Sequence, residues 1–121
     1  NKIPLINFNS NIDKAIKIIN QKNLGIGIII KKNNVIGIVT DGDMRRGLKN
    51  YSKKTKITSL MTKRPMFVGE NLSAEKALSI MSDKKITSLI VSSDKDYKKS
   101  RTVFKPKGIL HIHSLLKYGM R

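Results

Sequence analysis

The chain has 121 residues, 39% of them hydrophobic, and a formal net charge of +17, which is enough apolar material for one compact domain or two small halves. The absence of cysteine excludes disulfides, thiolate metal sites and cysteine nucleophiles, and it favours a cytoplasmic location. No apolar run approaches the roughly 20 residues that span a bilayer, and no signal peptide is visible, so we expect no membrane partner.

The first half of the chain predicts the order strand, helix, strand, strand, helix. The sequence starts at Asn1 rather than Met, inside the first strand, so we expect a fragment of a longer protein. Ser10 or Asn11 can cap the first helix. The helix is predicted by apolar residues at helical spacing, namely Ile12, Ala15, Ile16 and Ile19. A strand over 26–30, a tight turn over 31–34, a second strand and a short helix over 44–48 follow.

The second half predicts the same order of elements. Ser73 can cap a helix whose apolar positions are Leu72, Ala77, Leu78 and Met81. A buried strand over 88–91 follows it. The polar and basic connection over 92–106 is expected to be mobile, and a short helix over 115–118 closes the half.

The two halves are an internal repeat. Residues 13–19 align with 75–81 at an offset of 62, and the apolar segments 24–30 and 86–91 begin at the same offset, after which Gly37 aligns with Gly108. Each half is too small to bury a core alone. The sequence therefore predicts an α/β fold of two β-α-β-β-α units, residues 1–56 and 57–121, packed face to face.

A Thr-Asp-Gly-Asp turn, residues 40–43, joins an apolar strand to a basic helix. Free N–H groups at a helix start suit a phosphate, and a carboxylate beside them suits a ribose diol. We therefore expect Thr40 and Asp43 to contact a ligand. The alternative is that Asp43 only caps a helix beginning at Met44. Asp41 is interpreted as a turn residue beside that site, and Gly42 as the source of an unusual backbone angle.

Arg45 and Arg46 follow the turn. One of them can reach a phosphate or an acidic sugar, and the alternative is a solvated helix face. Consecutive helix residues point about 100° apart, so we do not expect both to face one pocket.

Two further sets of polar residues are candidates. His111 and His113 could form a metal pair, a hydrogen-bonding or pH-sensitive group at a cleft, or a structural contact. No nearby Asp, Glu or Cys completes a metal set, so we expect no metal. Thr87 and Ser88 open a strand and could bond a ligand, although polar residues at a strand edge are ordinary.

Three features of the chain are typical of one protein family: the repeated unit, the segment 37–43, which matches a Gly-h-h-Thr-x-x-Asp motif, and the segment 59–65. With these features the chain resembles a pair of cystathionine-β-synthase (CBS) domains, a Bateman module. This resemblance implies that Thr40 lies near a phosphate and Asp43 on ribose hydroxyls, with the ligand in the cleft between units. An adenine nucleotide is the ligand that the family implies.

A narrower resemblance rests on segments 40–46, 86–91 and 108–116, which look like the C-terminal CBS pair of bacterial arabinose-5-phosphate isomerases. It implies a non-enzymatic regulatory segment and a homo-oligomer. In those enzymes a sugar-isomerase (SIS) domain precedes the pair and converts ribulose 5-phosphate to arabinose 5-phosphate for the Kdo sugar of lipopolysaccharide, so the resemblance implies such a domain as a partner. The pathway product CMP-Kdo is then a candidate feedback ligand. Ser114 replaces the Asp of the family's His-h-His-Asp ending, so no carboxylate role is carried over there.

Three other functions stay open: a CBS pair from a sugar nucleotidyltransferase, a structural dimerisation module, and a nucleic-acid-binding module. The charge of +17 either forms a surface that binds a polyanion or reflects drift in the amino-acid composition. The lysines are spread along the chain without a block of five, so we do not expect nucleic acid as a partner. Segment 111–114 lacks both the Thr and the Asp of segment 40–43, so one nucleotide site per chain is expected.

Overall fold

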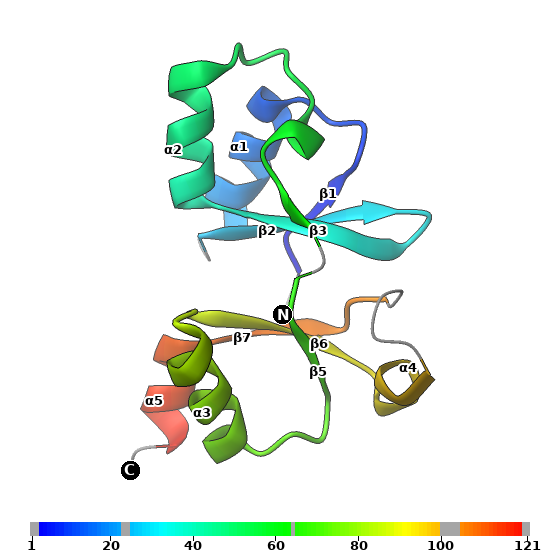
Figure 1. Cartoon of the computed structure of the whole chain (residues 1–121), viewed down its shortest axis with the longest axis vertical. Coiled ribbons are helices and arrows are strands. Elements are labelled where there is room, and N and C mark those ends of the chain that lie inside the picture. Colours follow the sequence, from blue (N-terminus) through cyan, green and yellow to red (C-terminus); the bar gives the residue numbers. More distant parts are fainter. Residues whose placement is uncertain (1–2, 23–24, 64, 100–104, 120–121) are drawn as a thin grey trace. The chain divides into compact units, whose positions relative to one another are not determined.

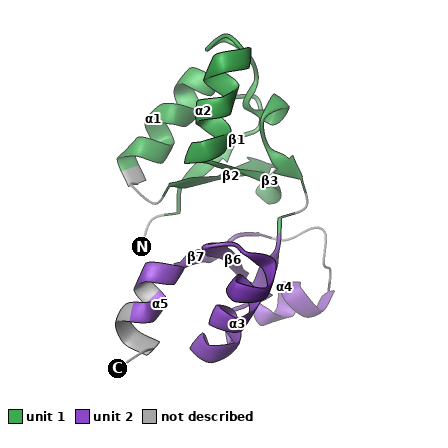
Figure 2. Ribbon diagram, turned by 60° about the vertical axis from the view of Figure 1, so that its left-hand side comes forward, with its two compact units in different colours: residues 1–65 green, residues 66–121 purple. Residues whose placement is uncertain are grey.

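A computed structural model of the chain describes residues 3–22, 25–63, 65–99 and 105–119. The chain forms two compact units, residues 1–65 and 66–121, each with its own sheet and helices (Figures 1 and 2). This confirms the predicted α/β class. In the described part of the chain, no helix is both long and apolar enough to cross a membrane.

Unit 1 is a four-stranded sheet with two helices on one side (Figure 1). Its elements are β1 (Leu5–Asn7), α1 (Ile12–Lys22), β2 (Ile26–Lys31), β3 (Asn34–Thr40), α2 (Asp41–Asn50), the 3-10 turn η1 (Ile57–Ser59) and β4 (Thr62–Lys63). The sheet order is β1-β2-β3-β4, with β1 parallel to β2 and the other pairs antiparallel. The parallel pair requires the α1 crossover between its strands.

The core of unit 1 lies between its sheet and helices. Its buried residues are Ile6, Ile12, Ala15, Ile19, Ile29, Val39, Met44 and Ile57. The helical spacing therefore identified the buried face of α1 correctly. Of the two candidate caps, Asn11 is the one used, because the Lys14 N–H donates to Asn11 Oδ1 at 2.9 Å.

Unit 2 repeats the arrangement with three strands. Its elements are β5 (Phe67–Gly69), α3 (Ala74–Lys84), β6 (Ser88–Ser92), α4 (Asp94–Lys99), β7 (Gly108–His111) and α5 (Ile112–Gly119). The order is β5-β6-β7, with β5 parallel to β6 and β7 antiparallel to it. Ser73 caps α3 as predicted, by accepting the Lys76 N–H at 3.2 Å. The core residues are Val68, Ala77, Met81, Leu89 and Leu115.

Helix α4 was not predicted. It lies inside the polar connection 92–106, of which residues 100–104 are outside the described part. Ser93 Oγ accepts the Asp96 N–H at 3.1 Å, which caps the helix. Asp94 also accepts hydrogen bonds from the side chain and the backbone of Asn71. A cap and a tertiary contact thus form a helix with no buried residue.

The repeat is also visible in two equivalent backbone hydrogen bonds. The Asp41 N–H donates to the Gly25 carbonyl at 3.0 Å, and the Ile112 N–H donates to the Thr87 carbonyl at 2.8 Å. These pairs differ by the offsets of 62 and 71 found in the sequence. In each unit the bond fixes the start of the last helix beside the start of the central strand.

The compact units divide after residue 65, nine residues beyond the boundary expected from the repeat. Ile57 is fully buried in the unit 1 core. Gly37 and Ile38 of β3 pair with Lys63 and Thr62 of β4. The segment that opens the second sequence repeat therefore packs on unit 1.

Candidate functional site

Thr40 and Asp43 form a capping box at the start of α2. The Asp43 N–H donates to Thr40 Oγ1 at 3.2 Å, and the Thr40 N–H donates to Asp43 Oδ2 at 3.0 Å. Thr40 is thus the N-cap, and the helix begins at Asp41. The predicted start at Met44 is wrong. The reciprocal cap lets the helix begin at Asp41, although Asp and Gly are poor helix formers.

Asp41 and Gly42 are therefore helical rather than turn residues. Among the described glycines only Gly25 has a left-handed φ, of 70°, so Gly42 supplies no unusual angle. The exposed Asp41 carboxylate lies in the first turn, where the helix dipole favours negative charge. A Cβ at Gly25 would lie 3.3 Å from Asp41 Oδ2, so Gly25, which the sequence analysis did not consider, shapes this corner.

Gly42 instead has room for a methyl group in ordinary contact with its neighbours. A Cβ built there would lie 3.5 Å from Arg46 Nη1, 3.7 Å from Thr40 Oγ1 and 4.0 Å from Arg45 Nη2. Atoms of both guanidinium groups therefore come within 4.0 Å of one Cβ position. Helical side chains lean toward the N-terminus of the helix. Arginine side chains are also long enough to approach one point from helix positions about 100° apart.

Arg46 also pairs with Asp43. Its Nη2 donates to Asp43 Oδ1 at 2.5 Å. The Arg46 side chain is 70% exposed and that of Asp43 only 16%. The start of α2 thus combines a hydroxyl, a carboxylate and two guanidinium groups, which are groups that can bind a phosphate and a diol.

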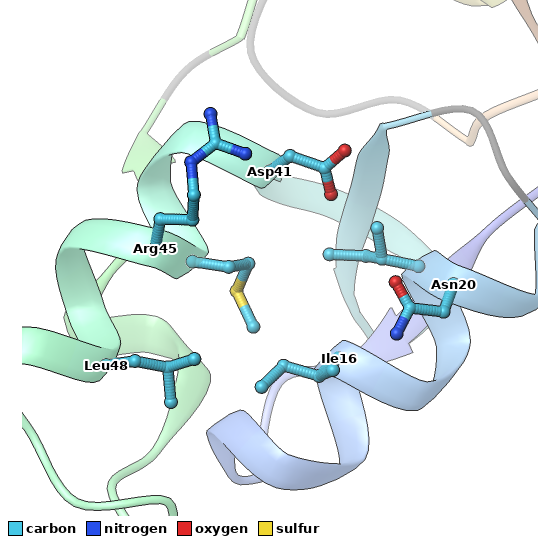
Figure 3. A pocket seen from close by; sticks show the side chains of 7 residues that line it. Ile16, Asn20, Asp41, Arg45 and Leu48 are labelled. Carbon is cyan, nitrogen blue, oxygen red and sulfur yellow. The ribbon is translucent and has the colours of Figure 1, made fainter.

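A groove of about 160 Å³ runs between α1 and α2 (Figure 3). Its lining is Ile16, Ile19, Asn20, Asp41, Met44, Arg45 and Leu48. Figure 3 shows Ile16 and Leu48 pointing into the groove from the two helices, with Asp41 and Arg45 near the start of α2. Arg45 therefore borders both the groove and the space over Gly42.

His111 has the place of Thr40 in unit 2. It ends β7, and its Nδ1 accepts the His113 N–H at 3.2 Å, so it caps α5. The two rings stack with centroids 4.9 Å apart. An accepting Nδ1 carries no proton. Burial, and then the charge of His113, lower the pKa of His111 below 6.5.

Thr87 and Ser88 lie beside His111. Ser88 is the register partner of His111 across β6 and β7, and the Thr87 side chain is exposed. The structure therefore brings Thr87, Ser88, His111 and His113 together in unit 2. In unit 1 it brings Thr40, Asp41, Asp43, Arg45 and Arg46 together. The described residues contain no group of three or more His, Asp or Glu side chains that could hold a metal ion.

Comparison with known sequences defines the class. A family model for the CBS domain matches residues 1–50 and 57–121. The chain belongs to the CBS-domain family and is a tandem CBS pair.

Its similarity to bacterial arabinose 5-phosphate isomerases is also confirmed. The isomerase KdsD of Francisella tularensis is 32% identical over 123 residues, 100% of this chain and 35% of the relative. An uncharacterized protein of Rickettsia prowazekii is 34% identical over 98% of this chain and 35% of the relative. The chain thus spans about a third of the length of these relatives.

Solved structures confirm the fold. A CBS domain protein from Pyrobaculum aerophilum complexed with AMP aligns with a TM-score of 0.80 at 12% identity, covering 100% of this chain and 94% of that one. The CBS domain pair of protein MJ0100, in complex with 5-methylthioadenosine and S-adenosyl-L-methionine, aligns with a TM-score of 0.77 at 23% identity, covering 100% and 92%.

Proposed function

We propose that this CBS pair is the regulatory segment of a cytoplasmic, homo-oligomeric arabinose-5-phosphate isomerase and binds an adenine nucleotide at the start of α2. The observation that carries the proposal is the convergence of Thr40 and both arginine side chains beside Gly42, with the Asp43 carboxylate bonded to Thr40 and Arg46. The named KdsD relative supports the isomerase, and the AMP in a solved CBS protein supports the ligand class. Interconversion of ribulose 5-phosphate and arabinose 5-phosphate would belong to a separate SIS domain.

The chemistry of the site explains the choice of ligand. A phosphate beside Gly42 would accept hydrogen bonds from the Thr40 hydroxyl and from the guanidinium groups, and it would lie at the positive end of the helix dipole. A ribose diol would donate to the Asp43 carboxylate. Because α1 and α2 contact each other, and Ile16 of α1 packs against the core that includes Met44 of α2, a ligand that shifts the start of α2 would also shift this helix pair. Regulation then follows if two states of the protein differ in affinity.

The proposal is tested by thermal-shift and calorimetric titration of the chain with AMP, ATP and CMP-Kdo. CMP-Kdo is included because it also joins a ribose to acidic groups. A specific ligand raises the melting temperature by mass action. We expect AMP to bind to the wild type, and Asp43→Asn to weaken that binding by roughly tenfold or more, because a neutral amide forms weaker bonds with a diol.

Asp43→Asn keeps an oxygen that can accept the Thr40 N–H, so the cap survives. Asp13→Asn is the matched control, since it removes one acidic side chain from the first turn of α1. Equal loss of binding in both variants would point to net charge alone. No binding of any of the three nucleotides at millimolar concentration would refute the proposal and favour a structural module.

A further inference from the structure

The carboxylate of Asp43 is occupied at both oxygens in the described structure. Oδ2 accepts the Thr40 N–H at 3.0 Å, and Oδ1 accepts Arg46 Nη2 at 2.5 Å. The carboxylate is held by the capping box and is 16% exposed, whereas the Arg46 side chain is 70% exposed. Of the two partners, the guanidinium is therefore the one that can leave without uncapping the helix.

A ligand hydroxyl that approaches Asp43 has to share or replace that contact. The bond from Arg46 is charge-assisted, so replacing it with a neutral hydroxyl is unfavourable unless the guanidinium gains another anion. An anion bound beside Gly42, which has no side chain, would be within reach of the same guanidinium. Arg46 Nη1 lies 3.5 Å, and Thr40 Oγ1 3.7 Å, from the position that a Cβ would take there.

We infer that Arg46 is a specificity-determining residue that covers Asp43 until a ligand supplies both a diol and an anionic group. The inference rests on the proposed function and deepens it. The diol takes the place of Arg46 on Asp43, and the released guanidinium pairs with the ligand's phosphate. The site then selects a nucleotide over the corresponding neutral nucleoside, which has the same diol but nothing to bind Arg46.

Arg45 allows the proposed role of Arg46 to be distinguished from simple attraction between a guanidinium and a phosphate. Its Nη2 lies 4.0 Å from the same position over Gly42, so it can also attract a phosphate. The ion pair with Asp43, however, is made by Arg46. Removing Arg45 should weaken binding of a phosphate only, whereas removing Arg46 should also uncover Asp43 for a nucleoside.

The test is calorimetric titration of AMP and adenosine into the 121-residue chain and three variants of equal charge change. For Arg46→Gln we expect AMP to bind roughly tenfold more weakly and adenosine roughly threefold more tightly. For Arg45→Gln we expect weaker AMP binding and unchanged adenosine binding. Lys49→Gln, one turn further along α2 from Arg45, is the control for net charge and should alter both little.

Two results would overturn the inference. If adenosine binding is the same in Arg46→Gln and Arg45→Gln while wild-type AMP binding still depends on Asp43, Arg46 does not cover the carboxylate and the proposed function stands without it. If the wild type binds neither AMP nor adenosine, the inference fails together with the proposed site. Melting temperatures of all variants, measured without ligand, show whether each is folded.

Discussion

At the scale of single residues, the capping pairs identify groups with two roles. Thr40 and Asp43 satisfy backbone N–H groups at the start of α2, and they are also the residues that we propose to contact the ligand. The sequence analysis weighed ligand contact against capping alone. The two roles are compatible, because a carboxylate has about four acceptor positions, of which the cap uses one and Arg46 another.

Two buried serines allow a matched test of hydrogen bonding in the cores. Ser10 Oγ is buried and has no hydrogen-bond partner among the described residues, whereas Ser92 Oγ donates to the Ser93 carbonyl at 3.1 Å. We expect Ser92→Ala to lower the free energy of unfolding by about 1 kcal/mol, and Ser10→Ala to leave it unchanged or raise it. Urea unfolding measures both. An equal loss in the two variants would show that Ser10 has a partner.

His111 predicts a pH dependence of stability. Its pKa in the folded chain lies below 6.5, chiefly because of burial and secondly because of the charge of His113. Below about pH 6.5 the unfolded chain therefore binds more protons than the folded one at this residue. This contribution to the free energy of unfolding falls as the pH drops through the folded-state pKa.

The measurement is urea unfolding between about pH 7.5 and about pH 5.5. His111→Asn, which can still cap α5, should flatten the dependence. His113→Asn should keep most of it, because burial is the larger cause and remains. Identical pH profiles for the wild type and His111→Asn would contradict the assignment.

At the scale of elements, the periodic spacing of apolar residues was sufficient to predict a helix that buries one face. Residues 12, 15, 16 and 19 identified α1, and the β-branched run over 26–30 identified β2. The start of α2 and the whole of α4 depend instead on polar side chains that bond to backbone N–H groups. Asp, Asn, Ser and Gly are equally common in turns, so their pattern alone did not separate a cap from a turn.

Substitution of Gly42 tests whether the first turn of α2 is adapted to ligand binding at the expense of stability. Gly42→Ala should raise the free energy of unfolding by up to about 1 kcal/mol, because alanine is the better helix former and a Cβ there meets its neighbours at ordinary contact distances. The same Cβ should weaken AMP binding, since it enters the space between Thr40 and Arg46. Urea unfolding and calorimetry measure the two effects.

Gly47 of the same helix is the control. A Cβ at Gly47 would collide with the Leu60 side chain, so Gly47→Ala should be destabilising without entering the proposed site. If Gly42→Ala stabilises the chain and leaves AMP affinity unchanged, the phosphate does not bind beside Gly42.

At the scale of the whole molecule, the repeat predicted two equivalent units, and both contain the expected order of elements with α4 added in the second. The sequence repeat assigned residues 57–65 to the second unit. Ile57 is packed into the unit 1 core, and β4 extends the unit 1 sheet. Those contacts are between residues distant in sequence, so local pattern carried no information about them.

The two units differ most at the start of their last helices. Unit 1 has Thr40 and Asp43 there, with Arg45 and Arg46 beside them, whereas unit 2 caps its helix with His111. The central claim is that this asymmetry leaves one nucleotide site in each chain.

Calorimetric titration of AMP into the wild type and Asp43→Asn tests that claim most directly. The account predicts one AMP per chain in the wild type and a loss of affinity of roughly tenfold or more in the variant. Two equivalent sites per chain, or unchanged affinity in Asp43→Asn, would contradict it.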